Sequence, residues 1–278
     1  MTPEIKIMGI VNVNDDSFFA GSRVSGAEQF VARVERLFGE GADVIDIGAC
    51  SSRPGSTYPG EEEEWRRMEP VLEVVRDKFL PRFTDSQPGG DYTGPRFSID
   101  TFSAEVVRRT FGIIGPFIVN DISAGQSDPE LLPLVAELGL PYVAMHNQIP
   151  FVMEGKQLRP IADGEGDIVA RVAGFFRGFE QRAAKAGLTD WILDPGFGFG
   201  KDVDENLELL NRVDELKCFG REILIGISRK RMTYQPLGLT PGDPRTLDET
   251  LRLERLAILR GASWIRAHDV AGIISLPK

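Results

Sequence analysis

Polar and charged residues stand directly after short apolar runs at several points of the chain, where buried strands would end. They are Asn12, Ser51–Pro54, Asp100, Asn120–Asp121, Met145–His146, Asp194, Ser228–Lys230 and Arg266–His268. The carboxyl ends of parallel strands meet at one rim of a barrel or one edge of a sheet, so these side chains can converge on one ligand. Both histidines of the protein, His146 and His268, belong to this set.

Five of these side chains are cationic or can become so: Arg53, Arg229, Lys230, Arg266 and His268. The protein as a whole is acidic, with a formal net charge of −10. Cations that converge on one rim of an acidic protein predict an anionic ligand, such as a phosphate or diphosphate.

Asp100, Asn120 and Asp194 are polar residues in otherwise apolar surroundings. A carboxylate can accept two parallel hydrogen bonds from the N–C–N edge of a heterocycle, as it does from arginine. We interpret the three residues as a site for the edge of a polar ring. Ion pairing with Lys230 or an arginine is the alternative, and the residues alone leave both open.

The run Asp194–Lys201 contains three glycines and two alternating aromatic residues, Phe197 and Phe199. Glycines let a backbone pass close to a ligand, and the aromatic rings could offer a flat face to another ring. A tight turn with core aromatics would explain the same residues equally well.

Eight short apolar runs along the chain have the continuous character of strands that are buried on both faces. They are Ile5–Val11, Asp43–Ile47, Phe97–Ile99, Phe117–Val119, Tyr142–Met145, Trp191–Leu193, Ile223–Ile227 and Trp264–Ala267. Eight strands alternating with helices in one chain of this length predict a single-domain α/β protein, a (β/α)8 TIM barrel over residues 1–278. A doubly wound sheet is the alternative, but Gly9–Asn12 is not the glycine-rich motif that it would normally carry.

Helical spacing of apolar residues appears between these runs, on Phe30–Phe38, on Ile168–Phe179 and at Leu251, Leu256 and Leu259. Asp128–Glu130 predicts a capped helix start, and Glu61–Glu64 the acidic first turn of a solvated helix. Glycines 41, 139, 187 and 261 predict left-handed helix ends. Thr84–Pro95 and Met232–Asp248 are predicted to be long surface loops.

Composition excludes several classes of protein. The acidic balance argues against nucleic acid or an anionic membrane as the main partner. Cys50 and Cys218 form no CxxC pair, which argues against a disulfide scaffold or a zinc site. Met1–Val11 lacks a basic segment, and no stretch of about 20 apolar residues occurs. We therefore expect no signal peptide, no membrane span and a cytoplasmic location.

Taken together, the strand-end motifs resemble those of the dihydropteroate synthase family along nearly the whole chain. They are Met8–Asn12 with Asp16–Phe18, Gly41–Gly48 with Ser51–Gly55, Ser98–Thr101, Asn120–Ser123, Met145–His146, Asp194–Lys201, Ser228–Lys230 and Arg266–Asp269. Ala20–Arg23 and Tyr234–Pro241 look similar to the Bacteroidetes-type members.

The resemblance implies a transferase of folate biosynthesis that condenses 6-hydroxymethyl-7,8-dihydropterin diphosphate with 4-aminobenzoate, giving dihydropteroate and diphosphate. It also implies Mg²⁺ and a homodimer, and Asp100, Lys230, Arg266 and His268 as the catalytic residues. The implied contacts are Asp100, Asn120, Ile122, Met145, Asp194, Phe199 and Lys230 for the pterin; Asn12, which also binds Mg²⁺, Ser52, Arg53, Ser228, Arg266 and His268 for the diphosphate; and Phe18, Pro54 and Lys230 for 4-aminobenzoate.

The chain departs from the family pattern mainly in loops. Asn14–Asp15 replaces Thr-Pro, Arg231 replaces a small serine, Cys50 stands where a glutamate or aromatic residue is usual, and Asn147–Ile149 follows His146. These departures keep open a pterin-binding paralogue without synthase activity. A pterin-dependent methyltransferase is a further alternative, although it would not need Ser51–Pro54 or Ser228–Lys230.

Overall fold

A closed barrel of eight parallel strands forms the centre of the protein. The computed structural model describes residues 5–13, 23–50, 58–84, 93–148, 151–153, 156–158 and 166–275. The strand order is β8-β5-β4-β3-β2-β1-β10-β9, and a parallel bridge between Leu193 and Ile223 joins its two ends. The strands are β1 (Lys6–Asn12), β2 (Val44–Gly48), β3 (Phe97–Asp100), β4 (Ile118–Asp121), β5 (Tyr142–Met145), β8 (Trp191–Asp194), β9 (Leu224–Ile225) and β10 (Trp264–Ala267). The predicted barrel is confirmed, and the alternative of a doubly wound sheet is wrong.

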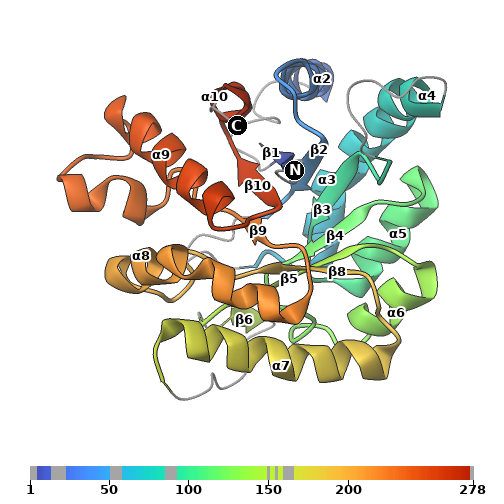
Figure 1. The fold of residues 1–278 in the computed structure, drawn as a ribbon. Helices are drawn as coiled ribbons and strands as arrows, with labels where there is room; N and C mark the ends of the chain where they lie inside the picture. Colours follow the sequence, from blue (N-terminus) through green and yellow to red (C-terminus); the bar gives the residue numbers. More distant parts are fainter. Residues whose placement is uncertain are drawn as a thin grey trace.

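Helices connect the strands and surround the barrel (Figure 1). They are α2 (Arg23–Gly39), α3 (Glu61–Val74), which continues through a π-helical turn (Val75–Phe79) into α4 (Leu80–Thr84), α5 (Ala104–Ile114), α6 (Leu131–Leu138), α7 (Ile168–Ala186), α8 (Val203–Asn211), α9 (Arg245–Leu259) and α10 (Val270–Ile274). A short antiparallel hairpin of β6 (Phe151–Met153) and β7 (Lys156–Leu158) precedes α7. Among the described residues, no helix is both long and apolar enough to cross a membrane.

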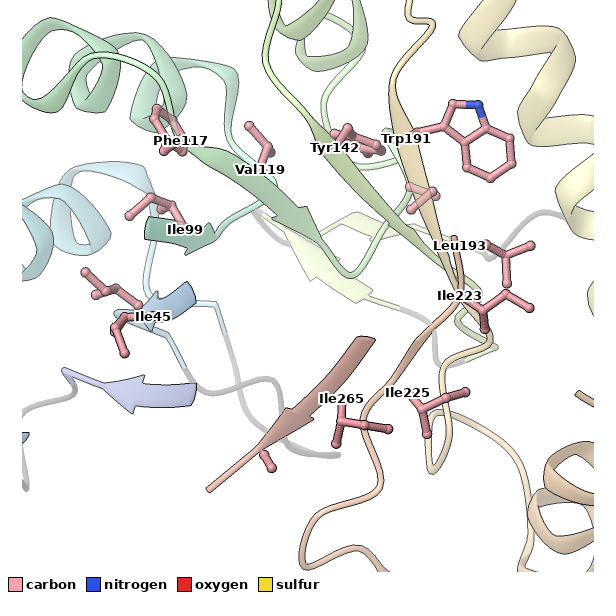
Figure 2. Packing of buried hydrophobic residues seen from close by; sticks show 14 of the residues in the cluster. Ile45, Ile99, Phe117, Val119, Tyr142, Trp191, Leu193, Ile223, Ile225 and Ile265 are labelled. Atoms are coloured by element: carbon pink, nitrogen blue, oxygen red, sulfur yellow. The ribbon is translucent and has the colours of Figure 1, made fainter. Parts of the chain in front are cut away.

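Side chains alternate between the inside of the barrel and its helix-covered outside, because successive residues of a strand face opposite sides. One buried cluster is made of inward positions: Met8, Val44, Ile118, Val143, Ile192, Leu224 and Trp264. Their neighbours along the strands belong to a larger cluster between strands and helices, part of which Figure 2 shows, with Ile45, Val119 and Ile265 among the labelled residues. Apolar burial on both faces explains why the strands read as continuous apolar runs.

The predicted helix faces are correct for two helices and partly wrong for the third. Phe30 in α2 and the five apolar positions of α7 from Ile168 to Phe179 are buried. In α9, however, Leu259 is 73% exposed, while Leu253 and Ala257 are buried. The leucine spacing pointed to a face rotated from the true one, because α9 packs through small and polar residues as well.

Local signals were mostly right about where helices begin and end. Glycines 41, 139, 187 and 261 all have positive φ, as predicted. Asp128 accepts a hydrogen bond from the Glu130 amide, but α6 itself begins at Leu131. Glu61 does begin α3, whereas Glu64 is only 1% exposed and accepts from the Tyr58 hydroxyl, so the first turn is not wholly solvated.

Of the two predicted long loops, one contains regular structure and the other lies mostly outside the described residues. Met232–Asp248 is not a loop throughout, since it contains short 3-10 turns at Arg231–Thr233 and Gln235–Leu237, and α9 begins at Arg245. Most of Thr84–Pro95 lies outside the described residues.

Candidate active site

The strand alternation decides which of the polar residues enter the barrel. Four polar residues face the inside of the barrel because each follows a member of the inner apolar cluster by two positions. They are Asp46 on β2, Asn120 on β4, Asp194 on β8 and Arg266 on β10. Asp100 ends β3 and pairs in register with Asn120 on one side and Gly48 on the other. Gly48 leaves room for it, because a Cβ there would lie 3.3 Å from the Asp100 Cβ.

Arg266 is held between two carboxylates on neighbouring parts of the barrel wall. Its Nε donates to Asp46 Oδ2 at 2.7 Å, and its Nη2 donates to Asp100 Oδ2 at 3.0 Å. Burial alone lowers the pKa of Arg266, but the two carboxylates raise it above its ordinary value. The alternative that the strand-end carboxylates pair with an arginine is therefore confirmed for Asp100.

Burial raises the pKa of Asp100, and Arg266 counteracts this while Asp46 adds to it. A carboxylate in this position holds its negative charge only with help from nearby cations, and its hydrogen-bonding capacity is not used up by Arg266. Asp100 can therefore serve a ligand as well as the ion pair.

Asp194 and Lys230 are the second set of opposite charges in the inward-facing group that we call the floor, and they attract each other without a direct ion pair. The floor consists of Asp46, Asp100, Asn120, Asp194, Lys230 and Arg266. Burial raises the pKa of Asp194, and Lys230 opposes this most strongly. Burial likewise lowers the pKa of Lys230 to about 8, against the attraction of Asp194. The Lys230 Nζ donates to the Phe197 carbonyl at 2.6 Å and lies 4.7 Å from the centre of the Phe199 ring.

An apolar wall lies beside these charged groups. Phe102, Ile122 and Met145 form one buried cluster, with Tyr58 and Phe199 packed against it. Three of the five, Ile122, Met145 and Phe199, are predicted pterin contacts, and the fold brings them together. Phe102 and Tyr58, whose rings are 4.6 Å apart, were missed because neither stands at the end of an apolar run.

A second group of predicted residues gathers above β9 and β10. The Ser228 hydroxyl lies 3.1 Å from His268 Nδ1 and accepts from the His268 amide at 3.3 Å. Burial, with Arg229 and Arg266 nearby, lowers the pKa of His268 to about 4. At this pKa His268 is neutral near pH 7 and offers a hydrogen bond rather than a positive charge.

Several predicted members of the rim face away from the barrel. His146 follows the inward Met145, so its ring faces outward, where it is fully buried edge-to-face against Phe175 of α7. Phe197 is likewise part of the outer core. Arg229 has φ 60° and pairs with Asp269, at 3.0 Å, so its guanidinium does not join the floor.

The glycines of Asp194–Lys201 are needed for close packing within the protein. A Cβ on Gly196 would lie 1.8 Å from the His146 carbonyl oxygen, and one on Gly198 would lie 3.1 Å from the Lys230 side chain. Both have positive φ. Lys201 Nζ donates to the Gly196 carbonyl at 2.8 Å and so stabilises the loop. The glycines therefore bring Phe199 and Lys230 to the floor.

Four predicted contacts belong to segments that the structure does not describe. Phe18, Ser52, Arg53 and Pro54 lie outside the described residues, as does Asn14–Asp15. Asn12 is exposed at the end of β1.

The described departures from the family pattern lie around the site rather than in its floor. Arg231 is exposed. Asn147 donates from its side chain to the Ile122 carbonyl at 3.3 Å. Cys50 is half-buried, and burial raises the pKa of its thiol, so it is a poor nucleophile.

Comparison with known proteins agrees with this geometry. The family model described as "Pterin binding enzyme" matches residues 8–268. The dihydropteroate synthase of Escherichia coli K12 is 36% identical, over 95% of this chain and 86% of its own length. The corresponding Streptococcus pyogenes enzyme is 33% identical, over 95% and 90%. A mitochondrial folate synthesis bifunctional protein of Arabidopsis thaliana is 35% identical, and the chain spans 47% of its length.

Solved structures give the same result. Xanthomonas albilineans dihydropteroate synthase with 4-aminobenzoic acid has a TM-score of 0.79 and 36% identity, covering 98% of this chain and 90% of that one. The same enzyme in complex with 7,8-dihydropteroate gives a TM-score of 0.74 and 32% identity, covering 99% and 91%. With its barrel, its strand-end motifs and these relatives, the chain belongs to the dihydropteroate synthase family of pterin-binding enzymes.

Proposed function

We propose that this protein is a dihydropteroate synthase, one pterin-binding barrel that joins 6-hydroxymethyl-7,8-dihydropterin diphosphate to 4-aminobenzoate. The amine nitrogen forms a bond to the pterin methylene carbon, the carbon–oxygen bond to diphosphate breaks, and the amine loses one proton. The observation that carries the proposal is the charge arrangement of the floor, where the carboxylates of Asp46, Asp100 and Asp194 lie beside the cations of Arg266 and Lys230.

The floor suits a ring that can carry positive charge. Three buried carboxylates against two cations leave an excess of one negative charge among these five residues. As the diphosphate departs, positive charge develops on the electron-rich pterin, and preoriented carboxylates stabilise it without reorganising. Asp100 joins this network through Arg266, whose Nη2 donates to it.

The ring itself would be held on its edge and on its face. Asp194 and Asn120 present acceptors for the N–H groups of the pyrimidine edge, and Lys230 can donate to a ring oxygen or nitrogen. Ile122, Met145 and Phe199 provide the apolar face. Lys230 would also reach the 4-aminobenzoate, whose other proposed contacts are Phe18 and Pro54.

The diphosphate would lie above β9 and β10. Ser228 and neutral His268 can donate hydrogen bonds there, together with Ser52 and Arg53. The Arg266 Nε and Nη2 are engaged by carboxylates, so Nη1 is the end of the guanidinium that can meet a phosphoryl oxygen. Each hydrogen bond to a charged diphosphate oxygen is worth roughly 1.5–3 kcal/mol.

The residues present fit the Mg²⁺ that the family implies. Asn12 offers one exposed amide oxygen at the end of β1, and Mg²⁺ typically takes few protein oxygens, completing its shell with phosphate oxygens and water. Asn12 would hold the ion, which would neutralise charge on the leaving diphosphate.

We also propose a cytoplasmic homodimer without nucleic-acid or membrane partners.

The test is diphosphate release by the purified full chain with the pterin diphosphate, Mg²⁺ and 4-aminobenzoate. A coupled colorimetric assay measures the released diphosphate. We expect release that depends on 4-aminobenzoate and that falls with Asp100→Asn, which should weaken pterin binding by about 1 kcal/mol or more. Pterin binding by calorimetry with no diphosphate above background would contradict the synthase and support a binding paralogue.

A further inference from the structure

Asp46 is a fully buried carboxylate in the middle of β2, with 0% of its surface exposed. It faces the inside of the barrel, two residues after Val44 of the inner apolar cluster and two before Gly48. Gly48 pairs in register with Asp100, so Asp46 lies one inward layer deeper than Asp100 and Asn120. A charged group at this depth is costly unless it has well-placed donors.

The donors of Asp46 come from two proposed ligand-binding residues. Its Oδ2 lies 2.7 Å from Arg266 Nε and 3.1 Å from Asn120 Nδ2. The Arg266 Nη2 is also within 2.6 Å of the same oxygen. One oxygen thus connects β2 with both β4 and β10, on opposite sides of the strand that carries it.

The hydrogen bond between Asn120 and Asp46 fixes the orientation of the Asn120 side-chain amide. A carboxylate that pairs with a guanidinium can only accept, so Asn120 must turn its Nδ2 toward Asp46. Its Oδ1 is then directed away from Asp46, which lies one inward layer deeper than Asn120. Without Asp46, the amide could rotate by half a turn and present a donor to the ligand.

We propose that Asp46 is a positioning residue for the pterin site: it holds Asn120 with its amide oxygen toward the ligand and holds Arg266 against Asp100. The inference rests on the proposed function, because it concerns the recognition of the pterin edge. It follows that Asp100, Asn120 and Asp194 present three oxygen acceptors, which select a ring edge rich in N–H groups.

Binding of the unreactive alcohol 6-hydroxymethyl-7,8-dihydropterin to the intact chain tests this by calorimetry. Asp46→Ala is expected to weaken binding about tenfold or more. Asp46→Asn keeps an oxygen that can accept from Arg266 and Asn120 but loses the charge, so its loss of affinity should be clearly smaller than that of Asp46→Ala. Asp43→Ala is the matched control, since that carboxylate accepts from the Ile7 amide at the opposite end of β2. Wild-type affinity for Asp46→Ala would overturn the proposal.

A double variant tests the route through Asn120. In an Asn120→Ala background, Asp46→Ala should weaken binding clearly less than it does in wild type, because the residue it orients is gone. Full additivity of the two losses would overturn the link. Failure of the wild-type chain to bind the alcohol would instead contradict the proposed function, so the two failures are distinguishable.

If Asp46→Ala does not fold, a crystal structure of the wild-type chain with the bound alcohol decides. An Asn120 Nδ2 that stays within hydrogen-bond distance of Asp46, with its oxygen facing a ring N–H, supports the role. An Asn120 side chain turned away from Asp46 overturns it.

Discussion

Two faces of the same strands carry polar groups in this barrel, and the two sets differ in how fully the protein satisfies them. On β4, Asn120 faces inward and Asp121, the next residue, faces outward. The Asp121 carboxylate accepts from the Tyr142 hydroxyl and from the amides of Ser123 and Gly125. Asn120 donates from its side-chain amide to Asp46, so its oxygen is directed away from that carboxylate.

The difference teaches how to separate structural from functional polar residues. Asp121 and His146 are completely buried and stabilise the packing of strands against helices or loops. Asp100, Asp194 and Lys230 lie among other charges in an inward-facing group whose hydrogen-bonding capacity exceeds what the protein uses. A strand-end polar group alone is therefore not enough to predict a ligand contact, and its facing must be known.

The strongest way to test this comparison is Asp194→Asn on the inner face. We expect kcat/KM for the pterin diphosphate to fall at least about 100-fold, because a charged acceptor for the ring edge is lost and Lys230 loses its counter-charge. The melting temperature should change little. Steady-state kinetics with thermal unfolding of the same preparation measures both, and an unchanged kcat/KM would remove Asp194 from the site.

The outer face should show the reverse pattern in Asp121→Asn. The asparagine would place an amide nitrogen where a carboxylate oxygen now accepts hydrogen bonds from the Tyr142 hydroxyl and two backbone amides. Because at least one of these buried donors would lose its acceptor, we expect the free energy of unfolding to fall by about 3 kcal/mol. Activity per folded molecule should stay within about twofold of wild type. Urea unfolding provides the measurement, and a kinetic defect without destabilisation would break the distinction between the faces.

The smallest expected effect concerns His268, which lies among cations on the inner face. Its pKa in the folded protein is about 4, below the ordinary value of 6.5, so the unfolded chain takes up a proton first as pH falls. Stability should therefore decrease from pH 6.5 toward pH 4, by up to about 2 kcal/mol from this group. His268→Gln should show a correspondingly shallower decrease in urea unfolding. Parallel curves for the two proteins would contradict a neutral, buried His268.

Much of the fold could be predicted from the sequence, because each strand is a continuous apolar run bounded by polar residues or glycine. The floor residues Asp100, Asn120 and Asp194 could be predicted for the same reason, since they end such runs. Asp46 was missed because it lies inside a run, although it shares the inward parity of Val44 and Gly48. His146 was included because rim position alone does not reveal on which face a side chain lies.

Other errors have different physical causes. The face of α9 was wrong because Leu259 follows the helical period yet meets no neighbouring element that would bury it. Tyr58 and Phe102 approach each other only through the packing of the segment before α3 against the end of β3, a contact that no local pattern encodes.

The closure of the barrel at β8 and β9 has a consequence for ligand binding. The named strand β9 has two residues, and Leu193–Ile223 is the bridge that joins it to the β8 side. Asp194 ends the strand on one side of this seam, and Lys230 follows the strand on the other. A pterin held by both residues would connect the two sides of this seam. Ligand binding would then stabilise the closed barrel against local opening between β8 and β9, and the closed seam would in turn favour ligand binding.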